Sequence, residues 1–96
     1  MDISNFRREY LKGGLQRENL ASDPVQQFTD WFEQARKTDI ADPTAMILAT
    51  VDSTGKPSQR TVLLKYYDNS GYVFFTNYGS RKAQEIDKNP KVSLLF

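Results

Sequence analysis

The segment NYGSRKA, residues 77–83, combines one hydroxyl and two cations in a way that could bind an anion. Ser80 suits the N-cap of a helix, which would place Arg81 and Lys82 at the first two helical positions. Cations at those positions oppose the helix macrodipole, at a cost of about 0.3–1 kcal/mol each. A bound phosphate would explain them, because free backbone N–H groups, the hydroxyl and both cations could converge on it. The alternative is that both side chains point into water.

A second pair of cations, Arg60 and Lys65, brackets an apolar run in SQRTVLLKYYD, residues 58–68. Side chains alternate between the two faces of a strand, so Arg60 would share its face with Val62 and Leu64. Lys65 would then lie on the opposite face. One interpretation is two separate anionic ligands, one for each cation. The alternative is two edge cations whose aliphatic stems lie beside apolar neighbours.

Three further polar residues, Thr76, Asn77 and Tyr78, follow the next apolar segment and could line a planar ligand. The alternative is that they are ordinary turn residues. Cysteine and histidine are absent, which excludes a disulfide, a Cys/His zinc site and a Ser-His-Asp triad built by this chain alone. No metal site is predicted, and a bound cofactor is the expected source of any chemistry.

One long helix is predicted near the N-terminal end of the region that positions these residues. Asp23 suits its N-cap and Pro24 its first helical position. Apolar residues then recur at spacings of three and four, with Trp31 beside them: Val25, Phe28, Phe32 and Ala35. This stripe indicates a face packed on the core rather than a ligand site.

Four short strands and a second helix are predicted after it. The strands are expected at residues 45–51, 58–67 and 72–76 and from residue 91 onward, with the second helix at 80–88. The first two strands should form a hairpin through the turn STGKP. We therefore expect a mostly β chain with flanking helices (α+β), divided into an N-terminal arm (1–22) and one folded unit (23–96).

The arm is expected to contain a short helix around residues 3–11, the alternative being disorder. At the other end, the last residues form an apolar strand with no stop signal, which would leave an open sheet edge. The sequence is therefore expected to be a fragment of a longer chain.

The composition narrows the class of protein. With 96 residues there is room for one domain, and a net charge of +1 argues against a nucleic-acid-binding face. No apolar run is long enough for a membrane span, and the charged first twenty residues do not form a signal peptide. The sequence thus predicts a cytoplasmic protein that binds neither nucleic acid nor membranes.

Several motifs in fixed spacing resemble the pyridoxamine 5′-phosphate oxidase family: RREY.KGGL, ADPTAM.LATVD, QR.VLLK.YD, TN.GSRKA and VSLLF. The resemblance extends from Arg7 to the last residue. It implies a split β-barrel, here its first half, that binds FMN as a homodimer. It further implies oxidation of pyridoxine or pyridoxamine 5′-phosphate to pyridoxal 5′-phosphate, with O2 reoxidising the flavin.

The resemblance also implies roles for individual residues. Arg60, Arg81 and Lys82 resemble the family residues at the FMN phosphate, and Lys65 resembles the one that reaches the substrate phosphate. Phe75 stands where some members have tyrosine. The FMN-binding residues implied are Arg60, Thr61, Val62, Leu63, Leu64, Lys65, Phe75, Thr76, Arg81 and Lys82. The substrate-binding residues implied are Lys65, Arg7, Arg8, Glu9 and Tyr10.

Two other functions remain open from the sequence. One is an FMN-binding split-barrel module without oxidase activity, and the other is a small β-domain that binds a partner through its open edge. Lys65 together with the RREY arm favours the oxidase, since a protein that only binds flavin needs neither.

Overall fold

The computed structural model describes residues 1–6 and 14–96 of the chain. The order of elements is η1 (Arg17–Asn19, a 3-10 turn), α1 (Pro24–Arg36), β1 (Ala45–Val51), β2 (Pro57–Asp68), β3 (Gly71–Phe74), α2 (Arg81–Lys88) and β4 (Ser93–Leu95). The predicted long helix, the predicted second helix and all four predicted strands are therefore present. The mostly β, α+β class is confirmed.

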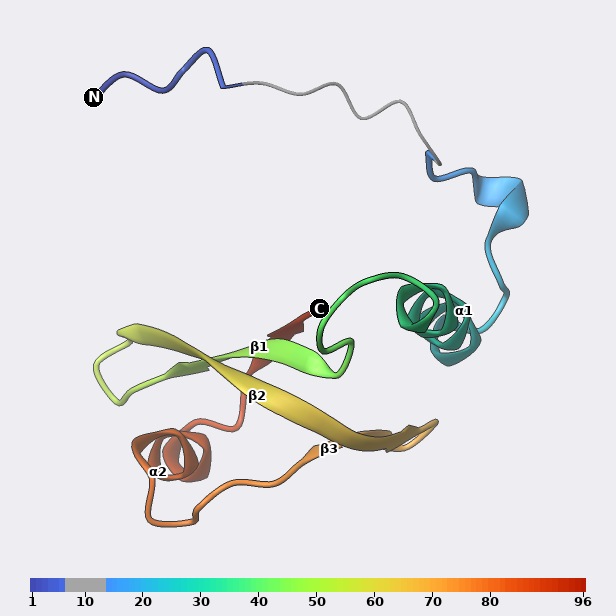
Figure 1. Ribbon diagram of the computed structural model, residues 1–96. Coiled ribbons are helices and arrows are strands. Elements are labelled where there is room, and N and C mark those ends of the chain that lie inside the picture. The colour runs from blue at the N-terminus through green and yellow to red at the C-terminus, as the bar shows by residue number, and fades with distance from the viewer. Residues whose placement is uncertain (7–13) are drawn as a thin grey trace.

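The four strands form one antiparallel sheet in the order β3-β2-β1-β4 (Figure 1). The predicted hairpin joins β1 and β2, with Leu48 opposite Arg60. The register of β2 against β3 shifts between Leu64 and Tyr66, so Lys65 is the extra residue of a bulge. The last strand, β4, pairs with β1, with Leu48 opposite Leu94.

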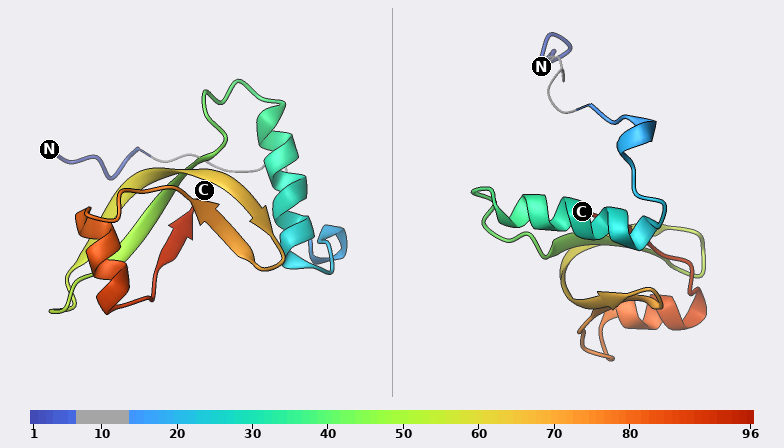
Figure 2. Two further views of the ribbon diagram at one scale, coloured as in Figure 1. Left: turned by 90° about the horizontal axis from the view of Figure 1, so that it is seen from below. Right: turned by 90° about the vertical axis from the view of Figure 1, so that its right-hand side faces the viewer.

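The core lies on one face of this sheet. Its buried apolar members are Met46, Leu48, Val62 and Leu64, which alternate with exposed or half-buried neighbours along their strands. Phe28 of α1 and Ile86 of α2 both pack against this cluster. The two helices lie towards opposite ends of the sheet (Figures 1 and 2), so the same face meets a different helix at each end.

The start of α1 forms as the sequence predicts. The Asp23 side chain accepts a hydrogen bond from the backbone N–H of Gln26 at 3.3 Å, and Pro24 is the first helical residue. The predicted apolar stripe is half-buried, and Phe28 reaches the core from it. Phe28 and Phe32 thus pack against other aromatic rings, as expected, whereas Trp31 is about half exposed.

Two sequence-based expectations were wrong in detail. The third strand ends at Phe74, so Phe75 and Thr76 lie in the following loop. Residues 3–6 form a turn, with the Phe6 N–H donating to the Ile3 carbonyl, and the rest of the helix expected there lies outside the described residues.

In the part of the chain that the structure describes, no helix is long and apolar enough to cross a bilayer.

Candidate functional site

The first half of β2 and the start of α2 enclose a surface depression that we call the cationic hollow. Its lining residues are Ser58, Gln59, Arg60, Ser80, Arg81 and Lys82. Three of the residues predicted to hold a phosphate therefore meet in one place. The helix α2 brings Arg81 and Lys82 to a strand residue more than twenty positions earlier in the chain.

The start of α2 is fixed by local hydrogen bonds. The Ser80 hydroxyl accepts from the backbone N–H of Ala83 at 3.3 Å, which confirms Ser80 as the N-cap. The Asn77 side chain accepts from the backbone N–H of Gly79 at 2.8 Å, as expected of a turn residue. Arg81 and Lys82 occupy the first two helical positions.

The guanidinium of Arg60 is held by groups on the neighbouring strand. Its Nη1 donates to the hydroxyl of Thr50 at 2.7 Å and to the carbonyl of Leu48 at 3.1 Å. Only 23% of the side chain is exposed. Arg60 therefore points to the core face as the alternation predicted, with its charged group at the edge of the cationic hollow.

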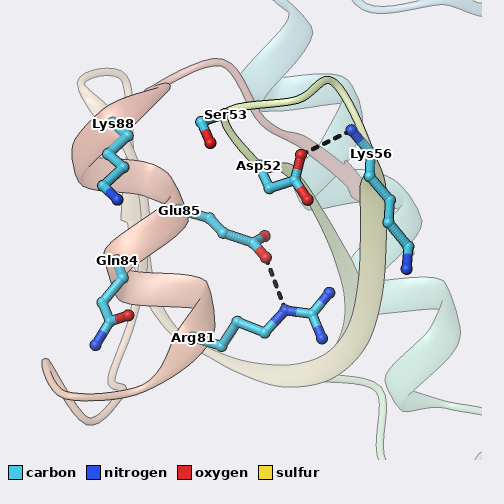
Figure 3. A pocket seen from close by; sticks show the side chains of 7 residues that line it. All are labelled: Asp52, Ser53, Lys56, Arg81, Gln84, Glu85 and Lys88. Carbon is cyan, nitrogen blue, oxygen red and sulfur yellow. Dashed lines mark hydrogen bonds and ion pairs between the residues drawn. The ribbon is translucent and has the colours of Figure 1, made fainter.

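The counter-charge comes from Glu85 of α2, a buried carboxylate. Its Oε2 accepts from the Thr50 hydroxyl at 2.5 Å and lies 3.8 Å from Nη2 of Arg60. Its Oε1 accepts from Nε of Arg81 at 2.9 Å (Figure 3). Arg81 also donates to the Ser58 hydroxyl at 2.6 Å, which ties the helix to β2.

This environment keeps Glu85 ionised. The hydrogen bond from Thr50 is the largest influence that lowers the pKa of the Glu85 carboxyl below its usual range, followed by the hydrogen bond from Arg81. Burial acts in the opposite direction and is outweighed. The charges of Arg81 and Arg60 lower the pKa further.

A second depression lies on the other side of Arg81, between α2 and the β1–β2 turn (Figure 3). It is lined by Asp52, Ser53, Lys56, Arg81, Gln84, Glu85 and Lys88. Arg81 and Glu85 project from the helix toward the hairpin and toward each other in this view. Arg81 therefore lines both depressions, whereas Glu85 lines only the second.

The remaining predicted residues of β2 lie elsewhere. Val62 and Leu64 are core residues, so only their backbone could meet a ligand. Thr61, Leu63 and Lys65 are exposed on the opposite face, as the alternation predicted.

Lys65 has a carboxylate near it. Hydrogen bonds from Thr44 lower the pKa of the Asp42 carboxyl, and the charge of Lys65 lowers it further. The two cations of the strand thus have different surroundings, Arg60 among buried partners and Lys65 on an open face.

The loop after β3 carries two more of the predicted residues. Phe75 is exposed, and the hydroxyl of Thr76 is buried without a hydrogen-bond partner among the residues described. Tyr78 is almost fully exposed. Arg7, Arg8, Glu9 and Tyr10, the residues predicted to bind substrate, lie outside the described residues.

Sequence reasoning missed Glu85, Thr50 and Ser58. A signal for Glu85 was present, since it follows Arg81 by four positions in a predicted helix, where opposite charges pair. Thr50 and Ser58 face each other across the hairpin, which follows once the register is known. The bond of Thr50 to Arg60 lies within the hairpin, whereas the bond of Ser58 to Arg81 depends on how α2 packs on the sheet.

Comparison with known proteins agrees with this architecture. The family model for pyridoxamine 5′-phosphate oxidase matches residues 32–96, more than half of the chain. The chain belongs to this family. Two relatives named pyridoxine/pyridoxamine 5′-phosphate oxidase, from Escherichia fergusonii and Escherichia coli strain K12, are each 58% identical to it over 94 residues. These alignments cover 98% of this chain and 43% of each relative, so the chain spans about two fifths of their length.

The fold has a counterpart among solved structures. A pyridoxamine 5′-phosphate oxidase-related, FMN-binding protein from Nostoc punctiforme superposes with a TM-score of 0.62, over 78% of this chain and 39% of that one. The sequence identity is 22%, so the likeness concerns the fold. The predicted fold class, the first part of a split barrel in this family, is confirmed.

Proposed function

We propose that this chain supplies the FMN-phosphate site of a pyridoxine/pyridoxamine 5′-phosphate oxidase. The observation that carries the proposal is the cationic hollow, where Arg60, Arg81 and Lys82 meet at a helix N-terminus. A phosphate monoester carries a charge of about −1.5 to −2 near pH 7 and offers three acceptor oxygens. Guanidinium groups and a helix N-terminus are suited to such a ligand.

Other residues of β2 and of the loop after β3 could meet the rest of the cofactor. The buried Thr76 hydroxyl lacks a partner among the described residues, and a ligand's polar group could satisfy it. The backbone of residues 61–64 would run along the flavin, since the side chains of Val62 and Leu64 are committed to the core. Phe75 offers an exposed ring but no hydroxyl.

Bound FMN would supply the redox chemistry, accepting a hydride from C4′ of the substrate and passing the electrons to O2. The chain's own residues would bind and orient the two phosphorylated partners. Arg60, Arg81 and Lys82 would hold the cofactor phosphate. Lys65, on the opposite face of β2, would bind the substrate phosphate, aided by Arg7, Arg8, Glu9 and Tyr10.

Catalysis would need residues beyond those of this chain, because the chain spans about two fifths of the length of its relatives. The proposed assembly is a cytoplasmic homodimer in which each flavin site uses both subunits. The further strands of the barrel and additional substrate contacts would come from the sequence that the relatives have beyond this region.

An FMN titration of the 96-residue chain, followed by quenching of flavin fluorescence and by size-exclusion chromatography, tests the proposal. Saturable FMN binding is expected, with riboflavin, which lacks the phosphate, binding at least about tenfold more weakly. Equal affinity for the two flavins would refute a phosphate site in the cationic hollow.

An oxidase assay with pyridoxine 5′-phosphate then separates the two flavin-based functions. Formation of pyridoxal 5′-phosphate would support the oxidase. Phosphate-dependent FMN binding without turnover, in this chain and in a chain extended to the relatives' length, would instead support a flavin-binding module.

A further inference from the structure

Glu85 occupies an unusual place for a carboxylate, since it is buried directly behind the two arginines that face the cationic hollow. Its side chain is 7% exposed, whereas that of Arg81 is 67% exposed. Burying a carboxylate is costly unless it is paired and hydrogen-bonded. Glu85 satisfies that condition with bonds from Thr50 and Arg81 and the nearby charge of Arg60.

These contacts close into a ring. Glu85 binds Arg81, Arg81 binds the Ser58 hydroxyl, and the Ser58 carbonyl accepts from Arg60 at 3.4 Å. Arg60 in turn donates to Thr50, which donates back to Glu85. The ring fixes where both guanidinium groups lie relative to each other, although they come from different elements.

The ring also sets the charge of the site. Arg60, Arg81 and Lys82 contribute three positive charges, and Glu85 subtracts one, which leaves a net charge of +2. That value balances a phosphate monoester dianion. Two guanidinium groups without the carboxylate between them would repel each other and move apart.

We propose that Glu85 is a positioning residue, which orients Arg60 and Arg81 so that both can bind the phosphate of the cofactor. This inference rests on the proposed function, because the ligand is the FMN phosphate. It assigns Glu85 no contact with that ligand. A purely structural ion pair is the alternative, in which Glu85 only attaches α2 to the sheet.

The discriminating quantity is the ratio of the riboflavin Kd to the FMN Kd, which isolates the contribution of the phosphate. For Glu85→Ala we expect this ratio to fall about tenfold, the size expected for one charge-assisted hydrogen bond, with the riboflavin Kd within about twofold of wild type. For Glu85→Gln we expect a smaller fall of about threefold, since the amide oxygen can still accept from Arg81 Nε.

Asp87→Asn is the matched control, because it removes the same charge from an exposed position on the same helix. Its ratio should stay within about twofold of wild type. If Glu85 acted only structurally, both Kd values would rise together and the ratio would not change. If it acted only by weakening the positive potential, Glu85→Gln and Asp87→Asn would both tighten FMN binding. Either result would overturn the proposal.

A second readout avoids flavin altogether. Inorganic phosphate is titrated into 15N-labelled chain while the Nε–H signals of the arginines are followed by NMR. Shifts of the Arg60 and Arg81 signals are expected in wild type and should be lost or much weakened in Glu85→Ala. Circular dichroism of each variant verifies that it is folded, and Glu85→Gln replaces Glu85→Ala if the latter is not.

The two readouts separate the failure of each proposal. The wild-type chain could respond to phosphate in a Glu85-dependent manner and yet bind FMN and riboflavin with equal affinity. That result would overturn the proposed function, but Glu85 would still position the two arginines of an anion site. A wild-type chain that responds to neither phosphate nor FMN has no anion site for Glu85 to organise, and both proposals would fall.

Discussion

The two ends of β2 use the same face of the sheet in opposite ways. At the α2 end, the inward side chain is Arg60, in a ring of hydrogen bonds with Thr50 and Glu85. At the α1 end, the inward side chain is Tyr67, stacked on Tyr72 at 5.7 Å between ring centroids. One end buries charge and the other buries aromatic surface, although a few residues separate them on one strand.

The difference shows how stability and binding can be separated within a small sheet. Aromatic burial is favourable without a ligand. A buried ion pair gives little net stability, because the cost of removing charges from water offsets their attraction. We therefore expect the α1 end to carry stability and the α2 end to carry binding, and the following variants test that division.

The largest expected effect is on stability, from Phe28→Ala. The Phe28 ring lies 4.7 Å from that of Phe96 and 4.9 Å from that of Tyr67, centroid to centroid. Its removal should lower the free energy of unfolding by about 3 kcal/mol, measured by urea denaturation. Trp31→Ala, on the same helix but half exposed, should cost less than about 1 kcal/mol. Equal losses in the two variants would contradict the role given to this cluster.

The next effect concerns the two cations of β2. Arg60→Ala should weaken FMN binding by about 10- to 100-fold, because it removes a charged hydrogen-bond donor from the phosphate. Lys65→Ala should chiefly raise the substrate KM, since Lys65 lies on the opposite face. Flavin titration and steady-state kinetics on a chain extended to the relatives' length measure the two effects. A shared defect in both variants would disprove this division of roles.

The sequence predicted the elements better than the site. Alternation along β2 correctly separated Arg60 from Lys65, and the Ser80 cap correctly placed Arg81 at the helix start, because both are local consequences of backbone geometry. Local spacing could suggest the Arg81–Glu85 pair, but it could not reveal the contacts of Glu85 with Thr50 and Arg60, which depend on how α2 packs on β1. Part of the conflict between Arg81 and the helix dipole is relieved by Glu85. The position of Arg81 at the helix start is therefore weaker support for a bound anion than the clustering of Arg60, Arg81 and Lys82 in the cationic hollow.

Acid should affect the α2 end through Glu85. Because its pKa is lowered in the folded chain by Thr50 and Arg81, the folded state binds fewer protons there than the unfolded state. The resulting stability is fully present above the ordinary glutamate pKa and is lost as pH falls through the lowered one. Urea denaturation at several pH values should therefore show a wild-type advantage over Glu85→Gln that shrinks on acidification. Parallel curves for the two proteins would contradict it.

The smallest expected effect comes from a hydroxyl pair at the α1 end. The hydroxyls of Thr29 and Tyr67 lie 2.7 Å apart and form a hydrogen bond that joins α1 to β2. Tyr67→Phe should cost about 1 kcal/mol of the free energy of unfolding, because it leaves the half-buried Thr29 hydroxyl without that partner. Tyr72→Phe is the matched control on the stacked neighbouring ring, and it should cost less than about 0.5 kcal/mol.

Neither variant should alter the ratio of the riboflavin Kd to the FMN Kd. If Tyr67→Phe lowered that ratio as Glu85→Ala is expected to, the two ends of the strand would be coupled, and the separation of stability from binding would not hold.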